Sequence, residues 1–486
     1  MQTLNSLTAL LWAVPSLLAC TGSAPPALET AETELTAEKG AVEARQAETP
    51  DATPDIPRGQ SLKFADPPAI KTGPLPKEVA EALDTAFGDN LAEWSWEEEQ
   101  FAALTTLLES GDVRLAWIFT DLIRVSPDRE LSSLLILIAS ELMGPNFALE
   151  DDWGAITDHL IAWDIPAPPG YVDLKRRIYS PLVPQWESII QPGQVDWRLV
   201  TWGGVRIDDR AYDTTDEPCS CIPAIDNPET QPAAEATWLK DSDIVFGIVV
   251  GESARAYPRR IMEVREMVND TLGGRDLAIP YCTLCASAQA FFTDQLPEGV
   301  ERPILRTSGL LSRSNKVMYD VRTYSVFDTF LGTALTGPLA AQELTLPQTG
   351  VVTTTFGEWK AKYPDTDVLI EDLALGRDFD FRNGRDADGP IFPIGDVDDR
   401  LAVQEDVLGI VTSSGTPVAF HASTAIKTLR SGGSIAFENV RVILDAGGLR
   451  AVDSAGEDLG GHQAFWFAWS QFYPDTVLWP DVPSAK

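Results

Sequence analysis

The 486 residues of the chain are enough for about three domains, because domains average roughly 150 residues. Hydrophobic residues make up 44% of the chain, as in proteins that fold around ordinary cores. The 73 acidic residues against 37 basic ones give a net charge of −36, and so acidic a surface repels phosphate backbones. Nucleic acid is therefore excluded as an expected partner.

The first twenty residues have features of an export signal. The run from Leu7 to Ala19 is uncharged and largely apolar, which suits a signal-peptide core and is too short to span a bilayer. It ends in "LLAC", which resembles the lipobox of bacterial lipoproteins, so Cys20 is the expected lipidation site. No Lys or Arg precedes the apolar run, so an ordinary cleaved signal or a buried apolar N-terminus also stays open. We predict a lipoprotein-type signal peptide over residues 1–20 and an outer-membrane-anchored or periplasmic protein that reaches the membrane through this anchor.

The next segment predicts a disordered acidic tether over residues 21–73. Residues 21–63 contain no aromatic residue and are rich in Ala, Glu, Thr and Pro. Such a composition buries too little apolar surface to offset the entropy lost on folding. The tether would hold the folded part away from the membrane.

Helical spacing of apolar residues begins near Pro74 and predicts an α-helical domain over residues 74–195. Four segments place apolar residues near i, i+3, i+4 and i+7, namely "EVAEALDTAF", "EEEQFAALTTLLESG", "DVRLAWIFTDLIRV" and "DRELSSLLILIASELM". Gly111 is expected to follow the end of the second helix, and the segment "SPD" from Ser126 to Asp128 to begin the fourth with a cap and a proline. We find no repeat period, so a small bundle that docks a protein partner is the expectation. His159 is a lone histidine here and fits a surface or packing residue better than a ligand.

From Trp197 onward the chain reads as a β-rich domain over residues 197–486. Short apolar runs such as "IVFGIVV", "DLAIPY" and "VRVILDA" alternate with Gly, Pro, Asn and Asp. Strands and helices do not alternate regularly, which argues against a doubly wound sheet. The predicted fold class is α+β, a helical N-terminal bundle followed by a β-rich mixed domain.

An internal echo predicts that the β-rich domain is built from two related units. "VFGIV" near Gly247 is matched by "VLGIV" near Gly409, and "WKAKYPDTDVL" is matched by "WSQFYPDTVLW". In both copies the Trp precedes the Tyr of "YPDT" by four residues, which is about one helical turn. We place unit one at about 241–371 and unit two at about 400–480.

Several motifs in a fixed order carry a resemblance to a known family. They are "IPAIDNP", "ARAYPRRIMEVREMVNDTLGGRDLAIPYCTLCASAQAFF", "TSGLLSRSNKVMYDVRTYS" and "GPLA". Together they closely resemble the bacterial family called domain of unknown function 3179, over roughly residues 202–479. The resemblance implies a domain and not a reaction, since the family has no assigned activity. Some relatives are described as selenoproteins, which implies redox chemistry for the family.

The sequence departs from the family pattern at several positions. Relatives have His-Glu where this chain has Arg265 and Glu266, and Cys-Pro-Leu-Cys where Thr283 stands here in place of Pro. They also have Trp and Gln near Phe327 and Thr329. If the histidine of the relatives is a base or a ligand, this chain has lost it.

The cysteines leave three chemistries open. Apart from Cys20, the chain has Cys219, Cys221, Cys282 and Cys285, an even number that in an exported protein suits disulfides in any of three pairings. As a thiol–disulfide redox pair, Cys282 would attack and Cys285 would resolve, with Cys282 needing a nearby cation or helix N-terminus. The third alternative is a zinc site formed by all four sulfurs, and no other cofactor is expected.

Residues around the cysteines supply weaker candidates for binding and catalysis. Arg255, Arg259 and Arg275 are cations near the pair in the sequence. By resemblance, Tyr257, Glu266, Asn269 and Asp270 fall on family positions; Asn269 and Asp270 also suit the turn before "GG". Glu266 would serve as a proton acceptor if it lies buried beside the cysteines.

The remaining candidates are histidines and tryptophans. His159, His421 and His462 lack ligand spacing, so no histidine metal site is expected. Trp466, Trp469 and Trp479 suit either a ligand cleft or a core. Two hypotheses therefore stand for an exported, lipid-anchored envelope protein: redox chemistry at Cys282 and Cys285, or a non-enzymatic binding or scaffold protein with structural disulfides.

Overall fold

A computed structural model provides the fold. It describes Ile56 and Gly59 together with residues 64–88, 97–149, 153–214, 219–371 and 390–481. The predicted signal peptide with Cys20 and most of the predicted tether lie outside the described residues. Within these ranges, no helix combines the length and the apolar character that crossing a membrane requires.

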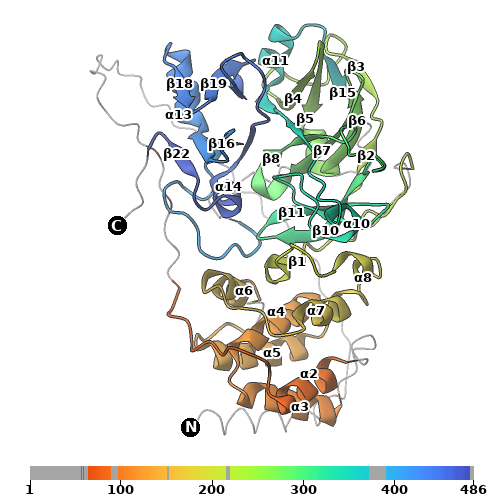
Figure 1. The fold of residues 1–486 in the computed structure, drawn as a ribbon, viewed down its shortest axis with the longest axis vertical. Coiled ribbons are helices and arrows are strands. Elements are labelled where there is room, and N and C mark those ends of the chain that lie inside the picture. Colours follow the sequence, from red (N-terminus) through yellow and green to blue (C-terminus); the bar gives the residue numbers. More distant parts are fainter. Residues whose placement is uncertain are drawn as a thin grey trace, which may run out of the picture.

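Seven helices of the described chain precede the first strand and fill the lower part of the molecule in Figure 1. They are α2 (Lys77–Phe87), α3 (Glu98–Glu109), α4 (Ala116–Val125), α5 (Arg129–Met143), α6 (Trp153–Ala162), α7 (Tyr171–Tyr179) and α8 (Trp186–Ile189). Helix α5 begins directly after the predicted "SPD" segment, and its cap is Asp128, whose carboxylate accepts hydrogen bonds from the backbone N–H groups of Glu130 and Leu131 at 2.9 and 3.1 Å. Gly111, with φ +57°, follows the Ser110 cap of α3.

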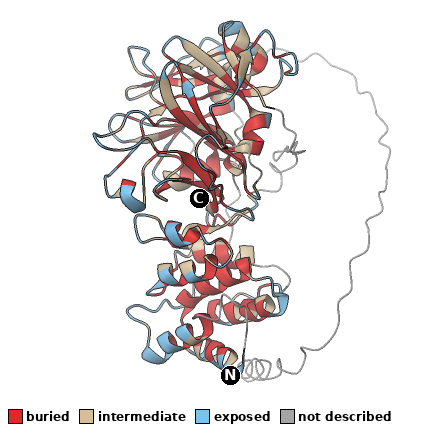
Figure 2. Ribbon diagram, turned by 90° about the vertical axis from the view of Figure 1, so that its right-hand side faces the viewer, coloured by how far each residue is buried: buried red, intermediate tan, exposed pale blue. Residues whose placement is uncertain are grey.

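These helices share a hydrophobic core with the β-rich part of the chain. Trp117 and Ile118 of α4 belong to the same cluster of buried side chains as Leu310 and Tyr319, which lie on strands. Two polar contacts cross the same boundary: Arg124 Nε donates to the Trp202 carbonyl and Trp186 Nε1 donates to the Ser308 carbonyl, each at 2.8 Å. The helices therefore pack on a sheet and do not form a bundle with a core of its own. Figure 2 shows the buried residues continuing from the inner helix faces into the strands.

The strands of the described chain form five separate sheets. The first, which packs on the helices, runs β1 (Val200–Trp202), β10 (Leu305–Ser312), β11 (Asn315–Asp320), β12 (Val326–Phe327). The second runs β13 (Gln348–Thr349), β9 (Ala290–Phe292), β7 (Arg275–Cys282), β6 (Met267–Leu272), β2 (Ile225–Asp226), with β8 (Ser287–Ala288) paired to β7.

The other three sheets lie farther from the helices (Figure 1). One runs β14 (Val352–Thr355), β4 (Ile244–Val250), β5 (Ser253–Pro258), β15 (Asp367–Leu369), β3 (Thr230–Pro232). The next runs β21 (His462–Phe465), β16 (Asp406–Val411), β17 (Pro417–His421), β22 (Val477–Trp479), and the last runs β18 (Ile435–Phe437), β19 (Val440–Asp445), β20 (Gly448–Val452). Five helices connect these strands: α9 (Arg259–Arg265), α10 (Gly337–Ala340), α11 (Phe356–Lys362), α13 (Ala422–Arg430) and α14 (Trp466–Phe472).

The predicted fold class, a helical bundle followed by two related β units, is wrong. The β-rich part has five sheets, in an arrangement of the five-bladed propeller kind, and the helices lie mostly N-terminal to it. The error has a physical cause. Alternating apolar runs identify strands, but strand partners are set by contacts between residues far apart in the chain, such as the pairing of β1 with β10.

Two of the five sheets do repeat one strand order. β14, β4, β5 and β15 pair antiparallel, antiparallel and parallel, and so do β21, β16, β17 and β22. In the first sheet Trp359 packs over Gly247, and its Nε1 donates to Thr366 Oγ1 at 2.9 Å. The sequence echo therefore corresponds to a repeated packing motif, while the other three sheets have no counterpart.

In the second copy, Trp469 packs over Gly409 and donates to Thr476 Oγ1 at 2.9 Å. A Cβ on Gly409 would lie 2.1 Å from the Trp469 ring, so Gly409→Ala should destabilise the fold by about 1–3 kcal/mol through overpacking. Urea unfolding followed by tryptophan fluorescence measures this. The matched control is Gly154→Ala, which meets open space on α6 and should leave stability equal or higher. Equal stability of the two variants would contradict the packing described.

Candidate functional site

The two cysteines of the CxxC motif lie where β7 turns back into β8. Cys282 ends β7, residues Thr283–Cys285 form one 3₁₀ turn, and Ser287 pairs with Cys282 as β8 begins. Both cysteines are free thiols; the relative exposure is 2% for Cys282 and 0% for Cys285. A dithiol in a tight strand–turn–strand segment is thus the centre of the candidate site.

The other two cysteines are bonded to each other. Cys219 and Cys221 form a disulfide while Cys282 and Cys285 are unbonded, so the structure contains one bond of the local pairing and none of the crossed pairings. The one group of potential metal ligands found among the described residues is Asp208 with these two cysteines, whose sulfurs the disulfide already joins. Hence the four sulfurs do not come together as the zinc alternative requires.

The backbone of the turn between β10 and β11 holds the thiols. Cys285 Sγ donates to Asn315 Oδ1 at 2.9 Å and lies 3.4 Å from the Ser314 carbonyl oxygen, which is also 3.7 Å from Cys282 Sγ. Ser314 and Arg313 both have left-handed backbone conformations, as do Ala286 after the motif and Glu266. Such conformations are costly for residues with a side chain, and they gather at sites where geometry matters more than local stability.

A buried ion pair lies beside the dithiol. Glu266, the residue after helix α9, and Lys316 on β11 are joined by 2.9 Å between Oε2 and Nζ, with side chains 11% and 4% exposed. Lys316 Nζ also donates to the Glu266 carbonyl, and Thr283 Oγ1 donates to Glu266 Oε1 at 2.9 Å. Both carboxylate oxygens of Glu266 and two N–H groups of Lys316 therefore have partners, and such additional hydrogen bonds are what a buried ion pair requires.

Sequence reasoning identified Glu266 and missed Lys316. The cations proposed for the cysteines each have another carboxylate: Arg255 pairs with Asp270, Arg259 with Glu263 and Arg275 with Asp294. A usable signal was present, because Lys316 is the one charged residue in "NKVMY", a stretch buried throughout. A lysine within such a strand is expected to have a buried partner.

The two thiols have different proton affinities. Burial alone would raise both pKa values, because a thiolate is poorly solvated inside a protein. Burial acts most strongly on Cys282 and raises its pKa, but the hydrogen bond with Cys285, the Lys316 ammonium and a backbone hydrogen bond at Lys316 together outweigh it, so the pKa of Cys282 lies below its ordinary value. Burial and the neighbouring Cys282 thiolate raise the pKa of Cys285 well above its ordinary value. Cys282 is therefore the more readily ionised of the two thiols, and Cys285 the one that holds its proton more firmly.

The ion pair acts on Cys282 with both of its charges. The Glu266 carboxylate raises the pKa of Cys282, and the Lys316 ammonium lowers it. Because the two charges are paired, their effects largely offset each other. Ser287 lies opposite Cys282 on β8 and is fully buried, and its hydroxyl has no hydrogen-bond partner among the described residues.

A cavity of about 260 Å³ reaches the site. Cys282, Thr283, Glu266 and Lys316 line it on one side, and Cys285 does not reach it. The rest of its wall is mostly apolar and comes from Val205, Ile222, Leu284, Leu310, Ile391 and Phe392. Cys282, although its relative exposure is only 2%, therefore borders a space that a small molecule can fill, and Cys285 does not.

The remaining predicted binding residues form internal contacts. Arg255 Nη1 and the Tyr257 hydroxyl each lie 2.6 Å from Asp270 Oδ2, and Asn269 Nδ2 donates to Asp226 Oδ1 at 2.9 Å. Asn269 and Asp270 lie inside strand β6, not in the turn suggested by the sequence. None of these four residues lines the cavity at Cys282.

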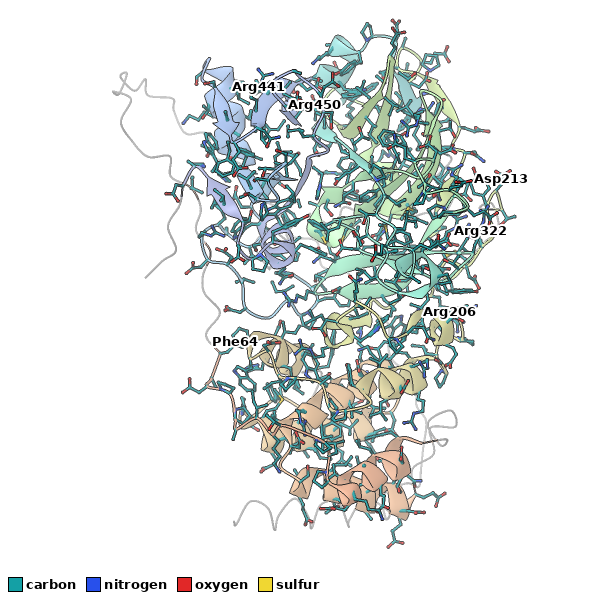
Figure 3. The ribbon with its side chains drawn as sticks, viewed as in Figure 1. Phe64, Arg206, Asp213, Arg322, Arg441 and Arg450 are labelled. Atoms are coloured by element: carbon teal, nitrogen blue, oxygen red, sulfur yellow. A yellow bond between two sulfur atoms is a disulfide. The ribbon has the colours of Figure 1, made fainter. Side chains whose placement is uncertain are left out.

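The histidines and tryptophans have packing roles. His159 contacts Phe64 at 5.0 Å between ring centroids, and Figure 3 places Phe64 at the edge of the helical part. Burial lowers the pKa of His462 to about 3, so its ring is neutral at pH 7. Trp466 and Trp469 are fully buried core residues.

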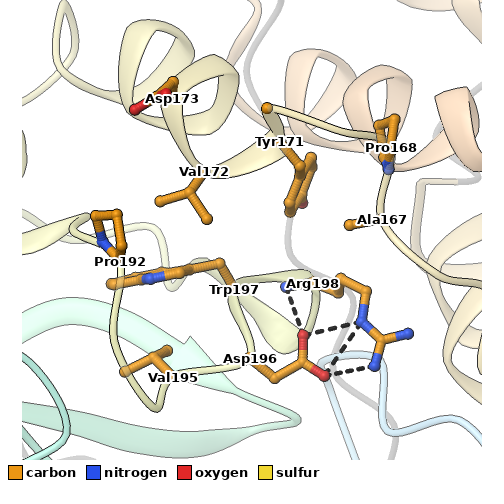
Figure 4. A pocket seen from close by; sticks show the side chains of 11 residues that line it. Ala167, Pro168, Tyr171, Val172, Asp173, Pro192, Val195, Asp196, Trp197 and Arg198 are labelled. Carbon is orange, nitrogen blue, oxygen red and sulfur yellow. Dashed lines mark hydrogen bonds and ion pairs between the residues drawn. The ribbon is translucent and has the colours of Figure 1, made fainter. Parts of the chain in front are cut away.

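A second cavity lies against the helices, as Figure 4 shows. It measures about 310 Å³ and is lined by Tyr171, Val172, Trp197 and the ion pair between Asp196 and Arg198, which is 2.6 Å long. No nucleophile or buried unpaired charge lies in its wall, so it supports no chemistry comparable to that of the dithiol.

Together these features define a β-rich protein with a buried, reduced dithiol, an adjacent ion pair and a small apolar cavity. Residues 219–458 match the family model described as Protein of unknown function (DUF3179). The chain is therefore a DUF3179 domain-containing protein, which confirms the resemblance seen in its motifs. No curated protein and no solved structure matches the chain. The matched residues contain both cysteine pairs and exclude the N-terminal helices.

Residues that depart from the family pattern take part in the site. Thr283 stands where relatives have proline, and its hydroxyl donates to Glu266. Thr329 stands near their Trp and Gln, and its hydroxyl donates to the Lys316 carbonyl at 2.5 Å. Arg265 stands in place of their histidine and pairs with Glu371. Of these three residues, only Thr283 contacts a side chain of the ion pair.

Proposed function

We propose that this protein is a thiol–disulfide oxidoreductase in which Cys282 attacks a disulfide substrate and Cys285 resolves the mixed disulfide. One observation supports the proposal above the others. Cys282, the thiol with the lowered pKa, borders the cavity, and Cys285, the thiol with the raised pKa, lies behind it. This is the division that the two steps of exchange require.

The proposed reaction has two steps. The Cys282 thiolate attacks one substrate sulfur, the substrate S–S bond breaks, and the departing sulfur takes a proton as a thiol. Cys285 then gives its proton to a base, attacks the Cys282 sulfur and releases the second substrate thiol. Glu266, whose charge acts on both cysteines, is the proposed proton acceptor. The substrate gains two electrons and two protons, and the dithiol becomes the Cys282–Cys285 disulfide.

The proposal includes export and a lipid anchor at Cys20. "LLAC" at the end of an apolar run supports it. The Cys219–Cys221 disulfide also supports it, because disulfides persist outside the reducing cytoplasm. Mass spectrometry of the protein isolated from membranes would detect an acylated Cys20 as the N-terminus, and an intact peptide covering residues 1–20 would contradict this part of the proposal.

Trapping separates the proposed roles of the two cysteines. Cys285→Ser should accumulate a mixed disulfide at Cys282, whereas Cys282→Ser should accumulate none, because Cys285 is protonated and does not reach the cavity. Iodoacetamide labelling of Cys285→Ala across pH should show Cys282 titrating higher than in the native chain, since the hydrogen bond with Cys285 is lost. Mass spectrometry locates the adducts. Equal trapping by both serine variants would contradict the assigned roles.

A binding or scaffold protein is the competing hypothesis. The near-complete burial of both sulfurs favours it, because buried cysteines also serve as small apolar packing residues. On that hypothesis Cys282→Ser lowers stability, and neither variant forms a mixed disulfide.

A further inference from the structure

The wall of the cavity that reaches Cys282 is mostly apolar, which does not suit a charged thiol compound. The relative exposure of Ile391 is 48%, and Ile391 also lines the cavity. An apolar residue therefore lies where the cavity meets solvent. Phe392 beside it is fixed by Trp153, at 6.2 Å between rings, and by the Arg124 guanidinium, at 5.4 Å from its ring. The approach to Cys282 is therefore apolar and held in place.

The charges within the cavity are already paired. Lys316 Nζ is bound by Glu266 Oε2 and by the Glu266 carbonyl oxygen, and Glu266 Oε1 accepts from Thr283. A substrate carboxylate would compete with Glu266 for the ammonium, and separating a buried ion pair is strongly unfavourable. An ammonium on the substrate would meet the same obstacle at Glu266. The cavity thus offers no site for a charged group.

The volume of the cavity and the net charge of the protein further restrict the class of substrate. Cavities that hold drug-sized ligands measure about 300–1,000 Å³, so 260 Å³ suits a molecule on the order of ten non-hydrogen atoms. Glutathione disulfide and protein disulfides are much larger. The net charge of −36 also repels anions from the surface as they approach.

We propose that the substrate of Cys282 is a small, uncharged disulfide with an apolar body. The inference rests on the proposed redox function and assigns its substrate class. The apolar wall binds the body, the S–S bond lies at the end lined by Cys282, and the two-electron exchange proceeds as described above. The ion pair limits the substrates to neutral ones.

Lipoamide and lipoate form a matched pair of probes, because they share one cyclic disulfide and differ in a single charged group. The reduced protein is mixed with each, and with glutathione disulfide, and oxidation of Cys282 and Cys285 is followed by mass spectrometry. Each rate is divided by the rate at which the same probe oxidises a free small dithiol. We expect the normalised rate for lipoamide to exceed that for lipoate, and that for glutathione disulfide, by about tenfold or more.

Ile391→Asp provides a test within the protein. It should slow oxidation by lipoamide about tenfold and leave labelling of Cys282 by the smaller iodoacetamide within twofold. Leu331→Asp is the control, because Leu331 is 42% exposed, lines a different cavity and does not line this one. It should leave both rates unchanged.

The outcomes separate the inference from the function on which it rests. Equal normalised rates for the three probes, or an unchanged lipoamide rate in Ile391→Asp, overturn the substrate class and leave the redox function standing. If no probe oxidises the dithiol at any concentration that oxidises the free dithiol, the redox function fails and the inference fails with it.

Discussion

Replacing Lys316 with methionine should lower the free energy of unfolding by about 3–5 kcal/mol and slow the labelling of Cys282 at pH 7. The substitution leaves the Glu266 carboxylate buried without its cation, and uncompensated buried charges cost this much. It also removes the charge that lowers the pKa of Cys282 and leaves the one that raises it. Urea unfolding and iodoacetamide kinetics across pH measure the two effects.

The partner substitutions make this prediction specific. Glu266→Gln should also destabilise the protein, but it should speed the labelling of Cys282 at neutral pH, because only the ammonium remains. The double variant Glu266→Gln/Lys316→Met should recover most of the stability, because no buried charge is left unpaired. Labelling rates that change in the same direction in both single variants would contradict the electrostatic account of the site.

Arg306→Met should destabilise the fold by a similar amount, about 3–5 kcal/mol, without changing the reactivity of Cys282. Arg306 is fully buried, its Nη1 and Nη2 lie 2.8 and 2.5 Å from the two carboxylate oxygens of Asp226, and removing it leaves that carboxylate without its cation. Asn269, one of the predicted binding residues, also donates to Asp226 and so belongs to the same network. Its role in this account is structural.

Two variants serve as controls for Arg306. Arg322→Met removes an ion pair with Glu301 whose side chains are 40% and 86% exposed, so it should cost less than about 1 kcal/mol; Figure 3 shows Arg322 at the surface. Asp226→Asn combined with Arg306→Met should restore part of the lost stability. Equal unfolding free energies for Arg306→Met and Arg322→Met would show that the buried network does not stabilise the fold.

The sequence predicted what depends on neighbours in the chain. Helical spacing and the "SPD" segment placed the start of α5 within a residue or so, and the order of motifs identified the family. The CxxC motif was recognisable because its two cysteines are close in sequence. In each case the signal and the structure that it forms occupy the same short segment.

The sequence could not predict what depends on distant residues. Lys316 reaches Glu266 across 50 positions, and no periodicity records such a pair. The pairing of the cysteines was open because three connectivities are compatible with four cysteines. The arrangement of five sheets depends on pairings such as β10 with β1, and local alternation of apolar residues is the same for any partner.

The central claim is that Cys282 and Cys285 form a reversible redox couple, and its reduction potential tests this most directly. The protein is equilibrated in buffers with varied ratios of reduced and oxidised lipoamide or dithiothreitol, and free thiols at the two positions are counted by mass spectrometry. We predict a potential well above about −300 mV, as for labile and catalytic disulfides. A potential below that value, or a pair of thiols that never oxidises, would contradict the claim and favour the scaffold hypothesis.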